Sequence, residues 1–131
     1  PGGATLLVEE MVAEGIEVLL GMTRDPHFGP LLVIGLGGIL VEVLKDVAFA
    51  RPPVSLYQAE NLWRSLKGFP LLEGVRGKPA GDLPALIRAT VDFSLMVRDL
   101  GDEFASIEIN PLLVLPRGRG VKAVDALFIQ A

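Results

Sequence analysis

Two segments with helical spacing lie between two stretches patterned as short β-strands, and this order limits the folds open to the chain. Strands are expected over residues 5–50 and again over 105–129, with helices only between them. The regular alternation of strand and helix that parallel α/β folds require is missing. The order therefore predicts an α+β fold, in which a mixed or mostly antiparallel sheet carries helices on one face.

The first stretch is expected to form short strands joined by hairpins. Residues 16–20 alternate and contain β-branched side chains, and residues 31–36 form the continuous apolar run of a buried strand. Residues 23–30, which contain Pro and Gly, are expected to be a loop. The glycines at 35–38 lack the spacing of a phosphate-binding loop, so a hairpin or bulge is favoured there.

Both predicted helices have clear start and stop signals. Ser55 and Gln58 form a capping-box pattern, followed by an apolar stripe that starts at Leu56 and ends before Gly68. Asp82 is expected to cap the second helix, which continues to Gly101. The Gly/Pro-rich residues 68–81 between the helices are expected to form a loop.

Composition excludes several classes of function. The 131 residues are half hydrophobic, which suits one packed domain over residues 1–131, and the net charge of −4 disfavours a nucleic-acid partner. With no cysteine, disulfides and thiol nucleophiles are excluded. The longest apolar run, residues 31–41, is too short to span a bilayer, and no signal peptide is visible. We therefore expect a cytoplasmic protein without a membrane partner.

The last strands carry the clearest chemical pattern. Glu108 and Asn110 are two residues apart, so they share one face of a strand, while Ile107 and Ile109 can anchor the other face in the core. A turn near Gly118 would bring a residue near Asp125 opposite Asn110, with a possible bulge at Pro111. Three oxygen-bearing side chains of this kind suit Mg²⁺. The alternative is that they are ordinary polar residues on a solvated strand face.

Other polar residues give weaker signals. Glu17 lies on an otherwise apolar strand face, so it belongs either to a sheet edge or to a site. Arg24 sits in an expected loop, where it could bind phosphate or simply be solvated. His27, the single histidine, is more consistent with a structural role, and no catalytic residue is assigned.

Several motifs, taken in order, resemble the ATP-grasp domain of NDP-forming acyl-CoA synthetases, in particular acetyl-CoA synthetase (ADP-forming). They are residues 15–21, 24–26, 28–30, 35–38 and 41–47, and the loop residues 70–72, 74 and 76–77. Near the end of the chain they are the Glu-x-Asn-Pro-Leu motif at 108–112, shared with the succinyl-CoA synthetase β-subunit, and the acidic strand at 124–126. The resemblance implies that Asn110 and Asp125 bind Mg²⁺ with help from Glu108. It also implies nucleotide-binding positions at Glu10, Met11, Val12 and Glu17, the first three of which match a hinge segment that meets adenine.

The resemblance further implies a reaction: acyl-CoA, ADP and phosphate are interconverted with acid, CoA and ATP, with Mg²⁺ and ATP/ADP as cofactors. The partner would be a CoA-binding domain or subunit that carries a phosphohistidine. The chain matches the C-terminal part of the ATP-grasp domain, without the N-terminal subdomain and its phosphate-binding lysine, so this part alone is expected to be inactive. Two alternatives stay open: a ligand-sensing, synthetase-like regulatory domain of a protein acetyltransferase, and an assembly domain whose carboxylates bind nothing.

Overall fold

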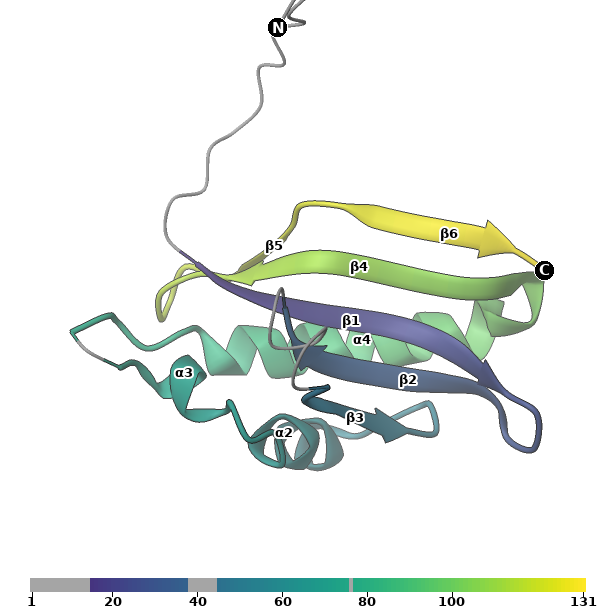
Figure 1. Cartoon of the computed structure of the whole chain (residues 1–131), viewed down its shortest axis with the longest axis horizontal. Helices are drawn as coiled ribbons and strands as arrows, with labels where there is room; N and C mark the ends of the chain where they lie inside the picture. Colours follow the sequence, from purple (N-terminus) through teal and green to yellow (C-terminus); the bar gives the residue numbers. More distant parts are fainter. Residues whose placement is uncertain (1–14, 38–44, 76) are drawn as a thin grey trace, which may run out of the picture.

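A computed structural model describes residues 15–37, 45–75 and 77–131, which form one antiparallel sheet with helices on one face (Figure 1). In chain order the elements are β1 (Ile16–Asp25), β2 (Gly29–Leu36), β3 (Val47–Ala50), α2 (Leu56–Arg64), α3 (Pro70–Glu73), α4 (Leu83–Leu100), the 3₁₀ turn η1 (Gly101–Glu103), β4 (Phe104–Val114), β5 (Val121–Ala123) and β6 (Ala126–Gln130). None of the described helices is long and apolar enough to cross a membrane.

The strands of the sheet follow the order β3-β2-β1-β4-β5, and β6 also pairs with β4. Every neighbouring pair is antiparallel. Figure 1 shows α4 running behind β1 and β2, roughly along the sheet, with α2 and α3 below it in the same view. The predicted α+β architecture, with a mostly antiparallel sheet and helices on one face, is therefore confirmed.

The core lies between the sheet and the helices. Val18, Leu20 and Met22 alternate along β1 and are buried against the helical layer, as the two-residue period of a strand requires. From the other side, Trp63 of α2 is fully buried, and its Nε1 donates a hydrogen bond of 2.9 Å to Oγ1 of Thr90 in α4. The opposite face of the sheet, here called the distal face, carries Glu17 and the other strand residues that alternate with the core positions.

Both helix starts form as predicted. Ser55 and Gln58 make the reciprocal capping box, and the Asp82 carboxylate accepts from the backbone N–H of Ala85 at the start of α4. Leu56 is an exception to the predicted apolar stripe, because it is 58% exposed. It stands in the first turn of α2, whereas the core contact of that helix is made further along, at Ala59 and Trp63.

Three boundaries differ from the sequence prediction. The expected loop at 23–30 is shorter, since cross-strand pairs continue to Asp25↔Gly29 and the Asp25 carboxylate accepts N–H groups of His27 and Phe28 across the turn. The expected loop at 68–81 contains the short helix α3. The part of the predicted strand region 105–129 that follows the turn near Gly118 is divided into β5 and β6, beside a bulge in β4 at which Pro111 offers no N–H to the ladder.

Candidate nucleotide and metal site

Glu108 and Asn110 of β4 share the distal face, as their spacing predicts. Nδ2 of Asn110 donates to Oε1 of Glu108 over 3.2 Å. The neighbouring isoleucines face the helices: Ile107 is buried, and Ile109 packs against the same core. The hydrophobic side of β4 therefore fixes which way its polar side chains point.

Asp125 lies directly beside Asn110, in the segment that connects β5 to β6. The N–H of Asn110 donates to the carbonyl of Asp125 over 3.0 Å, and the N–H of Val124 donates to the carbonyl of Pro111 over 3.1 Å. Two residues after Asp125, Leu127 pairs with Glu108. The pairing that the sequence predicted between the last strands is therefore present in the backbone.

A β-bulge in β4 sets the position of Asn110. Val18 pairs with Leu112 and Leu20 with Ile109, so Asn110 and Pro111 together oppose the single residue Leu19. A bulge bends the strand and re-aims the side chains on it. In this way Asn110 is placed at the point where β4 changes partner from β5 to β6.

The donor chemistry of these residues suits a hard cation. Asn110 and Asp125 are exposed and Glu108 is half-buried. Because Nδ2 of Asn110 is turned to Glu108, its carbonyl Oδ1 is the amide atom left for a cation. Across the described parts of the chain, no three acidic or histidine side chains gather as a metal cluster. A cation here would rely on an amide oxygen, one or two carboxylates, and oxygens of water or phosphate, a set that Mg²⁺ accepts.

Glu17 lies on the same distal face, at the start of β1. It pairs with Leu113 of β4, its carbonyl accepts the N–H of Gly37 over 2.7 Å, and its side chain is exposed. The predicted adenine-contacting residues Glu10, Met11 and Val12 lie outside the described residues.

The guanidinium of Arg24 binds backbone carbonyls of the protein itself. Its guanidinium donates to the carbonyls of Gly101 and Phe104, the latter over 3.0 Å. These bonds join the end of β1 to the turn that leads into β4. Arg24 belongs to β1 and not to the loop expected at residues 23–30.

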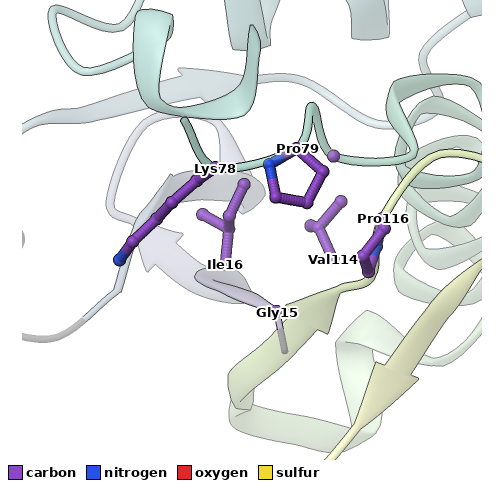
Figure 2. Close-up of a pocket in the computed structure, with 7 residues that line it drawn as sticks. Gly15, Ile16, Lys78, Pro79, Val114 and Pro116 are labelled. Carbon is purple, nitrogen blue, oxygen red and sulfur yellow. The ribbon is translucent and has the colours of Figure 1, made fainter. Parts of the chain in front are cut away.

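A small cavity that the sequence did not predict lies on the other side of the sheet. It measures about 240 Å³ and lies at the start of β1, between Gly15 and the segment Lys78–Gly81. Figure 2 shows Ile16, Pro79 and Val114 around it, with the nitrogen of Lys78 directed away from them. Ile16 and Val114 belong to the helix-facing side, so this apolar cavity is separate from Glu108 and Asn110. The Gly/Pro-rich composition of residues 77–81 was its only sequence signal.

Comparison with known proteins identifies relatives of this chain. The chain is 38% identical over 124 residues to the β subunit of an ADP-forming acetate–CoA ligase from Pyrococcus furiosus, covering 95% of this chain and 52% of that protein. It is 39% identical over 120 residues to an ADP-forming 4-hydroxybutyrate–CoA ligase from Nitrosopumilus maritimus, covering 92% of this chain and 17% of that protein. The chain thus spans about half the length of the β subunit that it matches.

A solved structure has the same fold. It is an acetyl-coenzyme A synthetase from Candidatus Korarchaeum cryptofilum in complex with coenzyme A and Mg-AMPPCP, with its phosphohistidine segment pointing towards the nucleotide binding site. The two chains superpose with a TM-score of 0.83 at 35% identity, over 92% of this chain and 55% of that one. The sequence profile described as the ATP-grasp domain matches residues 3–129, nearly the whole chain, and this chain therefore belongs to the ATP-grasp domain family.

Proposed function

We propose that this chain is the Mg²⁺- and nucleotide-binding part of an ADP-forming acyl-CoA synthetase. The observation that carries the proposal is the pairing of Asn110 with Asp125 beside Glu108, on the face of the sheet away from the helices. The identity to ADP-forming CoA ligases supports the reaction class: acyl-CoA, ADP and phosphate interconverted with acid, CoA and ATP.

Each residue would have a distinct role in this site. Oδ1 of Asn110 and the carboxylate of Asp125 would hold the metal, and Glu108 would orient the Asn110 amide through the Nδ2 contact. Glu17 would face the nucleotide, and residues Glu10–Val12 would meet the adenine edge. Bound Mg²⁺ supplies charge stabilisation to the phosphate groups during phosphoryl transfer.

The phosphoryl group would be received by another part of the enzyme. The Pyrococcus furiosus relative is one subunit of its ligase, and the Korarchaeum enzyme has a phosphohistidine segment that points towards its nucleotide site. We infer a CoA-binding domain or subunit that carries such a histidine as the partner of this chain. The exposure of Asn110 and Asp125 supports this, because an approaching segment could reach them.

Calorimetric titration of the intact protein with ADP, with and without Mg²⁺, tests the proposal. Asp125→Ala and Asn110→Ala should each weaken Mg²⁺-dependent ADP binding by roughly tenfold or more. Asp92→Ala is the matched control, since it also removes an exposed carboxylate but from helix α4. ADP binding that does not depend on Mg²⁺, or that survives both substitutions unchanged, would contradict the proposal.

A further inference from the structure

One lysine shares a row of side chains with the candidate site. Glu17 of β1 pairs with Leu113 of β4, and Leu113 pairs with Lys122 of β5, so the three residues lie side by side on neighbouring strands. Strands in a sheet are about 4.8 Å apart, which puts the backbones of Glu17 and Lys122 about 10 Å from each other.

The direction of the Lys122 side chain follows from its neighbour. Val121 pairs with the fully buried Val114 and packs against the core between sheet and helices. Because successive side chains on a strand point to opposite faces, Lys122 projects from the distal face, as do Glu17 and Glu108. Lys122 is half-buried although its strand lies at the sheet edge, so part of its stem lies against the sheet.

Lys122 lies close to the candidate metal ligands Asn110 and Asp125. Lys122 is three residues before Asp125 in the chain, and its partner Leu113 is three residues after Asn110. At about 3.4 Å per residue, this separates it from Asn110 and Asp125 by roughly 10 Å along the strands. A nucleotide diphosphate held by a metal at Asn110 and Asp125 would therefore bring its phosphates within reach of the four-carbon stem of Lys122.

The negative charge of the candidate site and of its nucleotide favours a cationic side chain such as that of Lys122. Glu17, Glu108 and Asp125 make the candidate site acidic. A bound nucleotide would add further negative charge, and a single divalent cation does not neutralise the phosphates of ADP. An ammonium group serves as a point-charge partner for phosphate. Resting on the function proposed above, we propose that Lys122 binds the phosphate tail of the nucleotide from the β5 side of the sheet.

The test separates phosphate binding from structural support by changing the ligand as well as the residue. Lys122→Met and Lys122→Gln in the intact protein are titrated with ADP, AMP and adenosine in the presence of Mg²⁺, and their thermal unfolding is recorded. We expect about a tenfold or greater loss of ADP affinity, a smaller loss for AMP and none for adenosine. Lys122→Arg should retain most of the affinity. Lys67→Met, an exposed lysine beyond α2 on the helix side, is the charge-matched control and should change nothing.

Each outcome has a distinct meaning. Unchanged ADP affinity in both Lys122 variants, or an equal loss for ADP and adenosine, would overturn the assignment of Lys122 while leaving the proposed function intact. If the unmodified protein does not bind ADP with Mg²⁺, the proposed function itself fails. Should Lys122→Met fail to fold, Lys122→Gln, which keeps a polar stem of similar length, decides the question.

Discussion

The Asp82 carboxylate accepts a hydrogen bond of 2.8 Å from the backbone N–H of Gly120, across 38 residues of chain. The same Oδ2 accepts the N–H of Gly118 over 3.1 Å, while Oδ1 caps α4 through Ala85 over 3.3 Å. A single buried carboxylate thus attaches the β4–β5 turn to the start of a helix. This attachment holds β5, which carries Lys122 and leads to Asp125, in place against the helical layer.

Asp82→Ala should therefore destabilise the protein more than the loss of a helix cap alone. We expect the free energy of unfolding in urea to fall by about 2–4 kcal/mol, because both the cap and two charge-assisted bonds disappear. Asp92→Ala, on the exposed side of the same helix, should change it by less than about 0.5 kcal/mol. Equal effects of the two substitutions would show that the turn is not held by Asp82.

The hydrogen bond between Trp63 and Thr90 gives a second stability prediction. Both side chains are fully buried, and the Thr90 hydroxyl also donates to the carbonyl of Leu86 over 2.7 Å. Thr90→Val leaves the indole N–H without a partner and should cost about 1–3 kcal/mol in chemical unfolding. Thr23→Val, at an exposed position near the end of β1, is the control and should be nearly neutral. A neutral Thr90→Val would mean that another group satisfies the indole.

Arg24→Met tests whether Arg24 is a structural residue. Removal of its bonds to the Gly101 and Phe104 carbonyls should lower the free energy of unfolding by about 1–3 kcal/mol. The affinity for ADP with Mg²⁺ at a temperature well below unfolding should stay the same. A selective loss of ADP affinity, with stability unchanged, would instead assign Arg24 to phosphate binding.

Local signals in the sequence predicted more of this fold than non-local ones. The caps at Ser55 and Asp82 depend on neighbouring residues, and both formed as expected. The role of Asp82 as an anchor for Gly120 depends on tertiary contact, which spacing along the chain does not encode. The division of the last strand depends in the same way on the bulge in its partner strand.

The same difference between local and non-local signals applies to the candidate site. The shared face of Glu108 and Asn110 follows from strand alternation, and Asp125 was placed opposite Asn110 by folding the chain back near Gly118. Lys122 was not singled out, because its direction depends on the burial of Val121 against the helices. Arg24 differs for the opposite reason: Pro26 and Gly29 nearby suggest a loop, but the strand pairs continue to Asp25 and Gly29 and include Arg24.

Glu108→Ala tests how the Asn110 amide is positioned. Without the carboxylate that accepts from Nδ2, the amide can rotate, and Mg²⁺-dependent ADP affinity should fall by about tenfold. Glu108→Gln keeps an acceptor oxygen for Nδ2 and should retain most of that affinity. ADP binding measured in EDTA should be equal in both variants. If Glu108→Gln is as weak as Glu108→Ala, the charge of Glu108 matters more than its contact with Asn110.

The most direct test of the account is to locate the metal itself. Crystals of the intact protein grown with ADP and Mn²⁺ in place of Mg²⁺ would give an anomalous scattering peak at each bound metal. We predict a peak about 2.0–2.3 Å from Oδ1 of Asn110 and from a carboxylate oxygen of Asp125, bridged to the nucleotide phosphates. A nucleotide-bound metal that contacts neither residue would contradict the account.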